Sequence, residues 1–368
     1  MKKFGLVLIL LLAGCDKPEP MYQWQLPNGF PKPQVPLDNP MSQEKVTLGR
    51  FLFYDKNLSG NGKQSCASCH QQDRAFAEMI PASIGSTGQF HARNSQALVN
   101  VAYNKNLTWA HQTLGSIERQ LLLPMFGETP IELGITGNEE AVLARFKTQA
   151  YKTKFTAAFG DDEINFDKIN KALASFVRSL LSFDSPFDRY AYGMQDDALS
   201  ESQLRGMDLF FSERLECHHC HGGFNFTQST SHEKQVLDRN AFHNTGLYNV
   251  GGSGNYPAKD QGLFDVTGDA NDKGRFRAPS LRNIALTAPY MHDGSVATLA
   301  EVLDIYAAAG RNIATGELAG DGRSNPHKSP FIKGFTLSEQ EKADLLAFLN
   351  ALTDENFIKN PAHSNPFK

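Results

Sequence analysis

The most informative part of this sequence is a pair of similar pentapeptides, Cys66-Ala-Ser-Cys69-His70 and Cys217-His-His-Cys220-His221. In each of them, two thiols separated by two residues can add to the two vinyl groups of one haem, and the adjacent histidine can reach the iron as proximal ligand. The two motifs use four of the five cysteines. They predict two covalently bound c-type haems. The predicted attachment and ligand residues are Cys66, Cys69, His70, Cys217, Cys220 and His221.

Two other kinds of site use paired cysteines, namely a four-cysteine zinc site and dithiol redox pairs. Neither explains why a histidine directly follows each pair, and the two pairs lie far apart in the sequence. His218 and His219 fill the variable positions of the second motif, and we interpret them as spacers.

Composition narrows the class of protein. The chain has 368 residues, which suggests two domains. A net charge of −4 with 21% charged residues provides no basic field, so no nucleic-acid partner is expected. With 40% hydrophobic residues, the chain can build sizeable cores and is not a disordered protein.

The first fifteen residues resemble a bacterial lipoprotein signal peptide. Met1-Lys2-Lys3 is a short positive region, and Phe4–Ala13 is an apolar run too short to span a bilayer. Leu12-Ala13-Gly14-Cys15 resembles a lipobox, which implies cleavage before Cys15 and lipidation of its sulfur. The alternative is an ordinary signal peptide with an incidental cysteine. We therefore expect a periplasmic protein held to a bacterial membrane by lipid alone. The choice between inner and outer membrane stays open.

Residues 16–40 contain seven prolines and are expected to form an extended tether, from which Trp24 and Phe30 can dock onto the body. Beyond them the patterns are helical. In 165–181, Ile169, Leu173, Phe176 and Leu180 form one helical stripe, and a further helix is expected over 44–54.

Two capping boxes, Thr298 with Glu301 and Ser338 with Glu341, are expected to open amphipathic helices. A weak repeat also exists, because a helix ending in phenylalanine precedes each haem motif. The fold class expected is all-α, with two cytochrome c-like domains that each carry one covalent haem. We place them at 41–194 and 195–358, followed by a tail at 359–368.

Several strings, taken together, resemble the bacterial di-haem cytochrome c peroxidase superfamily over nearly all of the folded length. They are Cys66–His70, Arg93-Asn94-Ser95, Trp109, Phe242–Leu247 and the long stretch Phe276–Gly294. Within that superfamily the chain is similar to the MbnH-like branch, which is related to MauG. Segments 24–31, 124–134 and 213–226 carry this narrower resemblance.

Two positions differ from ordinary peroxidases of that superfamily. A methionine on the helix after the His292-Asp-Gly turn usually ligates the second haem, and here the matching residue is Tyr306. Ser86 stands near the usual distal histidine, so the first haem is expected to keep an open position opposite His70. A phenolate is a hard anion that favours Fe(III) and higher oxidation states, so Tyr306 would suit a haem that stores oxidising equivalents.

Alternatives remain for both positions. Tyr306 could simply be a buried aromatic of an amphipathic helix, and Tyr290 and Met291 are rival ligands of the second haem. His91 is an alternative distal ligand of the first haem.

The resemblance also implies catalytic roles. Glu132 would shuttle protons and Gln120 would stabilise developing charge while the O–O bond breaks. Trp109 would relay an electron hole between the two irons. The simpler interpretations are a surface carboxylate, an amide on a helix surface and a core tryptophan.

A bound Ca²⁺ between the haems is implied as well. Its ligands would be the side chain of Asn94 and the backbone carbonyls of Thr287 and Pro289, completed by water.

The function favoured is that of a haem-dependent oxidoreductase that uses H₂O₂. It would reach a high-valent, bis-Fe(IV)-type state and oxidise a residue of a partner protein. By resemblance, that residue is a tryptophan converted to kynurenine in an MbnP-type copper-binding protein. The alternative is a periplasmic di-haem cytochrome c peroxidase that reduces H₂O₂ with electrons from a small cytochrome or cupredoxin. A passive di-haem electron carrier is a third hypothesis.

Overall fold

The computed structural model describes residues 22–236 and 241–368. The predicted signal peptide, including Cys15, and the start of the predicted tether lie outside the described residues. Among the described residues, no helix combines the length and apolar composition that crossing a bilayer requires.

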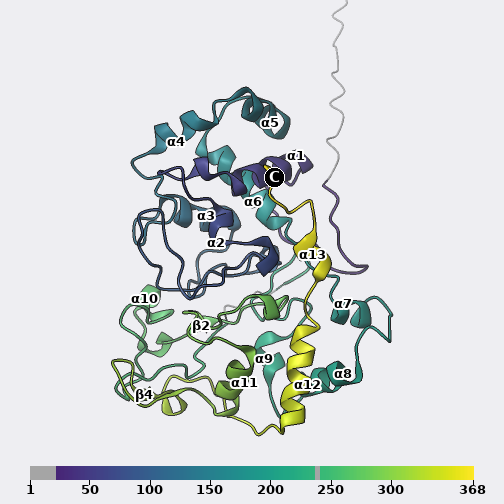
Figure 1. Ribbon diagram of the computed structural model, residues 1–368, viewed down its shortest axis with the longest axis vertical. Coiled ribbons are helices and arrows are strands. Elements are labelled where there is room, and N and C mark those ends of the chain that lie inside the picture. Colours follow the sequence, from purple (N-terminus) through teal and green to yellow (C-terminus); the bar gives the residue numbers. More distant parts are fainter. Residues whose placement is uncertain (1–21, 237–240) are drawn as a thin grey trace, which may run out of the picture.

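The chain forms two halves stacked along its long axis (Figure 1). The first half is built on six helices in the described part: α1 Gln43–Tyr54, α2 Cys66–Cys69, α3 Ile117–Phe126, α4 Glu139–Phe146, α5 Gln149–Phe159 and α6 Phe166–Arg178. One continuous hydrophobic core joins them, and the haem motif of α2 lies at its edge.

The second half contains α7 Pro186–Ala191, α8 Glu201–Phe210, α9 Cys217–His221, α10 Phe264–Thr267, α11 Leu299–Ala307 and α12 Glu339–Asn350. Two antiparallel pairs of two-residue strands accompany them, β1 Phe242–His243 with β2 Phe276–Arg277 and β3 Asn312–Ile313 with β4 Gly320–Asp321. The fold is therefore mostly helical, as expected, and these strands are too short for any alternating pattern to have revealed them.

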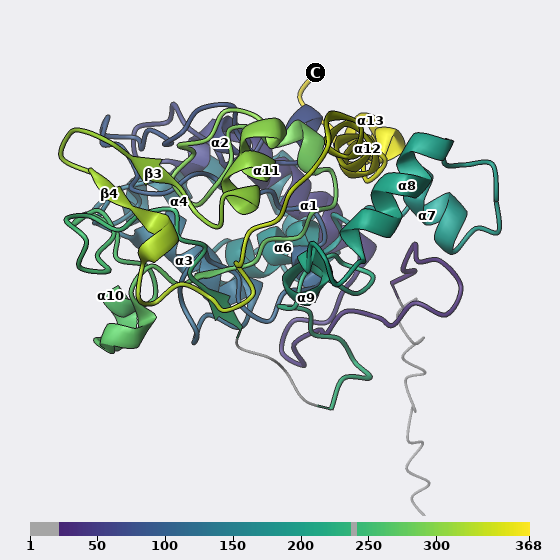
Figure 2. The ribbon, with the colours of Figure 1, turned by 90° about the horizontal axis from the view of Figure 1, so that it is seen from below.

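The chain ends by returning to the first half. Helix α13 Glu355–Lys359 follows α12, and Figure 2 shows these two helices along one side of the molecule with α10 on the opposite side. The Phe357 ring lies 5.9 Å from that of Phe76, and Arg50 Nε donates a hydrogen bond to the Ser364 carbonyl. The last residues therefore tie the two halves together, while the domain limits 41–194 and 195–358 stay a prediction.

The weak sequence repeat corresponds to a repeated helix crossing. Gly49 of α1 faces Ala172 of α6, and Gly206 of α8 faces Asp344 of α12. A Cβ atom added to either glycine would lie 2.0 Å from the facing carbonyl oxygen. Glycine thus permits both close crossings, and each one holds the helix that precedes a haem motif.

Local signals were confirmed where they were strong. Helix α1 begins at Gln43, one residue before the expected start. Helix α6 buries Ile169, Leu173 and Phe176 but ends at Arg178, so Leu180 of the predicted stripe is buried just beyond the helix. Helices α11 and α12 begin at the predicted capping boxes, in which the glutamate side chain accepts from the backbone of the cap residue.

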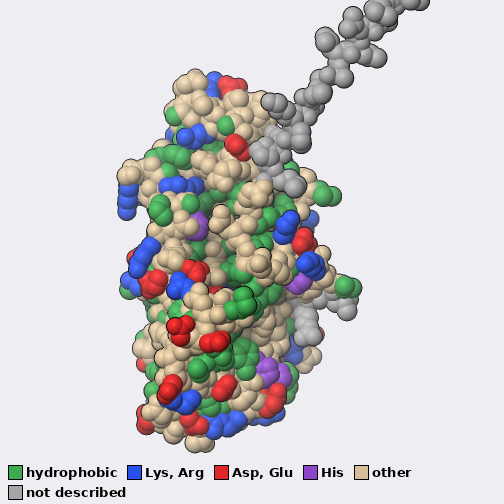
Figure 3. All heavy atoms as spheres, turned by 90° about the vertical axis from the view of Figure 1, so that its right-hand side faces the viewer, with side chains coloured by type: hydrophobic (Ala, Val, Ile, Leu, Met, Phe, Trp, Pro, Cys, Tyr) green, Lys and Arg blue, Asp and Glu red, His purple; other side chains and the backbone are tan. Residues whose placement is uncertain are grey.

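Residues 22–40 contain no helix or strand. Phe30 packs its ring against those of Phe183, Tyr192 and Phe224 at 4.8–5.3 Å, whereas Trp24 packs against Tyr22. On the face that includes α7, α8 and α12, acidic and basic side chains are interspersed (Figure 3).

Candidate haem sites and the region between them

The second haem motif opens onto a cavity of about 310 Å³ in the second half. Cys217, Cys220 and His221 of α9 line it, and so does Tyr306 of α11. The structure therefore brings the predicted attachment residues and the predicted sixth ligand to one cavity, although they lie far apart in the sequence.

Both motif histidines are oriented by their Nδ1 atoms. In His221 this atom lies 3.0 Å from the Pro279 carbonyl oxygen, and in His70 it lies 2.8 Å from the Phe76 carbonyl oxygen. An Nδ1–H donated to a carbonyl leaves Nε2 as the ligand atom, which is the usual arrangement in metal sites. Burial lowers the pKa of His221 to about 4 and lowers that of His70 as well, so both imidazoles are neutral, as ligation requires.

The cavity contains the two rival ligands too. Tyr290 and Met291 line it, but the Tyr290 hydroxyl donates to the Ile284 carbonyl at 3.2 Å. Burial raises the pKa of Tyr306, so its phenol keeps its proton until a cation displaces it.

Arg277 gives this cavity an unusual charge. Its guanidinium is buried, and it donates to the backbone oxygens of Thr108 and Ala278 and to the Gln96 amide oxygen, with no carboxylate partner among the described residues. Burial lowers its pKa to about 10, so it remains a cation. A buried cation facing a largely apolar cavity fits a cofactor with an apolar ring and acidic substituents, as haem has. The residues present therefore fit a covalently attached haem.

A close backbone contact joins the segment around Ser86 to the segment that carries Glu132. Ser86 donates its N–H to the Glu132 carbonyl at 2.8 Å, and a Cβ atom on Gly85 would lie 1.8 Å from the Ile131 oxygen. Only glycine allows this approach, which fixes the segment that carries Glu132.

Glu132 is the most perturbed carboxyl group near this motif. Burial raises its pKa to about 7. Burial also raises the pKa of the Cys66 and Cys69 thiols to about 12, and the negative charge of Glu132 contributes to the rise in both thiols. Its Oε1 lies 3.7 Å from Nδ1 of His91, whose pKa is lowered by burial. His91 is therefore neutral at pH 7, and the raised pKa of Glu132, whose side chain remains 40% exposed, suits proton exchange near neutral pH.

Gln120 lies on α3, where its Oε1 atom is buried and has no hydrogen-bond partner among the described residues. Its predicted role stays a prediction. Sequence reasoning missed Glu78, a buried carboxyl that accepts a 2.5 Å hydrogen bond from the Ser83 hydroxyl. Burial raises the Glu78 pKa, and the Glu78 charge raises that of Cys69. A lone acid within Phe76-Ala-Glu-Met-Ile80 was the signal available.

A second, smaller cavity of about 80 Å³ lies beside the first. Asn94, Thr287 and Pro289, the three predicted calcium ligands, all line it. The Asn94 Nδ2 atom donates to the Ile80 carbonyl at 3.0 Å, which leaves Oδ1 as the oxygen it could offer a cation.

Trp109 lines both cavities, and its Nε1–H donates to the Asn94 carbonyl at 2.9 Å. The backbone N–H of Arg277 donates to the Trp109 carbonyl at 2.7 Å. The indole is thus fixed at the boundary between the second haem cavity and the predicted calcium site.

Known proteins are similar to this chain in sequence and in fold. A model of the di-haem cytochrome c peroxidase family matches residues 43–196, and a RoxA-like, cytochrome c-like model matches 275–308. Cytochrome-c peroxidase IdrP1 of Pseudomonas sp. (strain SCT) is 35% identical over 88% of this chain and 84% of its own length. The chain belongs to the di-haem cytochrome c peroxidase family.

Two further similar proteins indicate the branch of the family to which the chain is related. Methylamine utilization protein MauG of Methylophilus methylotrophus is 31% identical over 90% of this chain and 88% of its own length. A MauG-like protein associated with microbial copper homeostasis has a crystal structure with a TM-score of 0.92 and 52% identity, covering 94% of this chain and all of that one. The chain is thus a MauG-like, haem-dependent oxidoreductase with cytochrome c-like domains and two c-type haems.

Proposed function

We propose that this MauG-like enzyme uses H₂O₂ to oxidise a residue of a partner protein rather than to consume peroxide for its own sake. The observation that carries the proposal is Tyr306 in the cavity of the second haem motif, at the position where ordinary peroxidases carry methionine. A hard phenolate in that place favours the oxidised iron and disfavours a haem that accepts electrons from a carrier. Each haem, when bound, supplies an iron that can take up oxidising equivalents.

The residues around the first motif serve the proton chemistry. Reduction of one H₂O₂ to two waters consumes two electrons and two protons. Glu132, with a pKa of about 7, can accept a proton from peroxide at neutral pH and return it to the departing oxygen. Gln120 is proposed to donate its side-chain N–H to that oxygen. His70, held by its Nδ1 contact with the Phe76 carbonyl, would be the residue that ligates the iron of this haem.

Trp109 is proposed to relay electrons between the two halves. Its ring lines both cavities and is held by hydrogen bonds at Nε1 and at its carbonyl. We also place a Ca²⁺ at Asn94, Thr287 and Pro289, where a hard cation would find oxygen donors and complete its shell with water.

The partner we propose is an MbnP-type copper-binding protein of the periplasm, in which a tryptophan is oxidised to kynurenine. Opening the indole ring is a four-electron oxidation that uses two H₂O₂, and hydrolysis then releases the lost ring carbon as formate. Support comes from the solved relative at 52% identity, which is described as MauG-like and associated with microbial copper homeostasis. Lipidation of Cys15 would hold the enzyme at a bacterial membrane, inner or outer.

A di-haem cytochrome c peroxidase fed by a small cytochrome or cupredoxin is the second candidate. The curated relatives named cytochrome-c peroxidase, 35% identical in one case, favour it. Tyr306 weighs against it, because an electron-entry haem is better served by a soft ligand. Ser86 weighs against it as well, because it stands near the place of the distal histidine that often closes the first haem in resting peroxidases.

Mass spectrometry of a co-expressed partner, with and without H₂O₂, tests the choice. We expect a tryptophan-containing peptide of the partner to shift by the mass difference between kynurenine and tryptophan, one oxygen gained and one carbon lost, only with peroxide and the two-haem enzyme. An unmodified partner, together with rapid peroxide-dependent oxidation of reduced cytochrome c, would establish the second candidate instead.

A further inference from the structure

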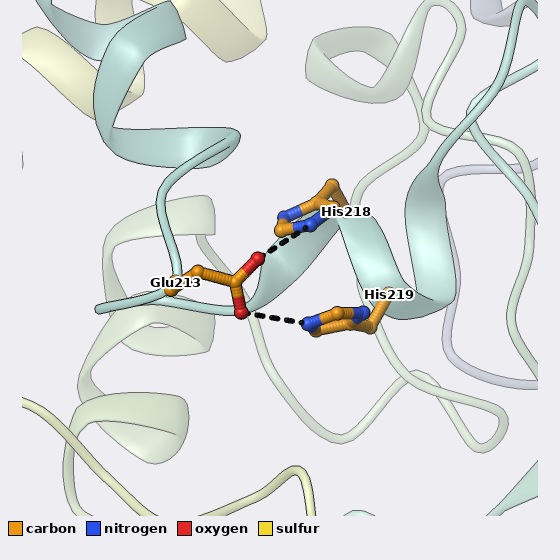
Figure 4. A group of neighbouring side chains, drawn as sticks. All are labelled: Glu213, His218 and His219. Atoms are coloured by element: carbon orange, nitrogen blue, oxygen red, sulfur yellow. Dashed lines mark hydrogen bonds and ion pairs between the residues drawn. The ribbon is translucent and has the colours of Figure 1, made fainter.

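Two histidines and one carboxylate converge at the surface beside the second haem motif. His218 and His219 lie on α9, and Glu213 lies in the turn that precedes this helix. Nε2 of His218 is 3.5 Å from Oε1 of Glu213, and Nε2 of His219 is 3.3 Å from Oε2. Figure 4 shows both rings directed at the same carboxylate. The interpretation of these histidines as spacers does not account for this arrangement.

Neighbouring aromatic rings hold the two imidazoles in place. His219 stacks on Phe331 with ring centroids 5.0 Å apart and an interplanar angle of 24°, and the two imidazole centroids are 4.3 Å apart. Nδ1 of His218 is buried and has no hydrogen-bond partner among the described residues, so Nε2 is the atom this ring offers. The donor atoms are therefore positioned by the fold itself.

The donor set matches a particular class of cation. Imidazole nitrogens and a carboxylate oxygen suit late first-row divalent ions such as Cu²⁺ and Zn²⁺. Two donors that each lie about 2.0–2.1 Å from a tetrahedral cation are separated by about 3.3 Å. The two nitrogen–oxygen separations are 3.3 and 3.5 Å, and the three donor atoms all lie within 4.8 Å of one another.

The cluster also lies at the rim of the second haem cavity. Glu213 and Phe331 line that cavity together with Cys217, and an ion pair between Glu216 and Lys333 at 3.1 Å flanks it. We propose that Glu213, His218 and His219 bind one Cu²⁺ or Zn²⁺ at this rim, with water completing the coordination. This proposal is independent of the partner and of the reaction proposed above.

The test uses the holoenzyme with both haems attached. After dialysis against Cu²⁺ or Zn²⁺, elemental analysis should find one bound equivalent beyond iron and calcium, and the electron paramagnetic resonance spectrum of bound Cu²⁺ should show coupling to two imidazole nitrogens. His218→Ala and His219→Ala should each weaken binding at least about tenfold. Haem content should not change, because the haem motif tolerates other residues at its variable positions.

Two further variants keep the test decisive. Glu213→Gln lies outside the haem motif and should weaken binding as well, even if the histidine variants mature poorly. His232→Asn removes a histidine outside the cluster and should bind like the wild type. The proposal is overturned if the holoenzyme binds no additional Cu²⁺ or Zn²⁺. It is also overturned if binding survives in Glu213→Gln and the His218→Ala/His219→Ala double variant.

Discussion

The proton-transfer role proposed for Glu132 yields a quantitative prediction. Burial raises the pKa of this carboxyl group to about 7, and the neighbouring His91, whose own pKa is lowered by burial, provides no positive charge to bring it back down. If the ionised carboxylate accepts the proton of H₂O₂, the second-order rate of the reaction with peroxide must follow the deprotonated fraction of Glu132. That rate should therefore rise with pH.

The size of the rise follows from the pKa. A group that titrates near 7 is about 9% ionised at pH 6 and about 91% ionised at pH 8, so the rate should increase about tenfold over this range, with its midpoint near pH 7. Glu132→Gln keeps the shape of the side chain and removes the titration. We expect this variant to react with peroxide about 10²–10⁴-fold more slowly, and its rate should no longer change with pH around pH 7.

Stopped-flow mixing of the holoenzyme with H₂O₂ at a series of pH values, followed in the haem absorption bands, measures both effects. Glu128→Gln changes an exposed carboxylate on the same loop and should reproduce the wild-type profile. A Glu132→Gln enzyme that retains the wild-type rate and the midpoint near 7 would show that another group transfers the proton, and buried Glu78 would be the first to examine.

Three more outcomes are expected. Gly206→Ala should lower the free energy of unfolding by about 1–3 kcal/mol, because its Cβ would lie 2.0 Å from the Asp344 oxygen, whereas Gly115→Ala, with its nearest contact at 3.7 Å, should melt like the wild type in calorimetry. Trp109→Phe should retain the reaction with peroxide and slow oxidation of the partner in single-turnover assays; equal rates would reduce Trp109 to a packing residue. Dialysis against a calcium chelator should remove one Ca²⁺ per chain by elemental analysis, and Asn94→Ala should reduce calcium binding in the same assay; retention of the ion by that variant would place the calcium elsewhere.

The sequence identified what depends on neighbours along the chain. The haem motifs, the apolar stripe of α6 and the capping boxes of α11 and α12 are local patterns, and each one follows from covalent spacing or helix geometry. The helix that precedes each motif could also be recognised, although the close crossings at Gly49 and Gly206 became visible only in three dimensions.

What the sequence did not reveal depends on contacts between distant segments. Nothing in 355–368 indicates that it returns to pack against Phe76 and Arg50. His218 and His219 both contact Glu213 because of the way the turn before α9 folds back. This contact could not be predicted from the sequence, in which the two histidines only fill the variable positions of the haem motif. Arg277 belonged to a string used for the resemblance, but its burial without a carboxylate partner among the described residues required the structure.

Tyr306 decides between an oxidase that acts on a partner protein and an ordinary peroxidase. A crystal structure of the oxidised holoenzyme would show directly which atom is bonded to the second iron on the face opposite His221. We predict the phenol oxygen of Tyr306 bonded to that iron, and a first iron with no protein ligand opposite His70. A sulfur or imidazole ligand at the second iron, or a histidine closing the first, would contradict it.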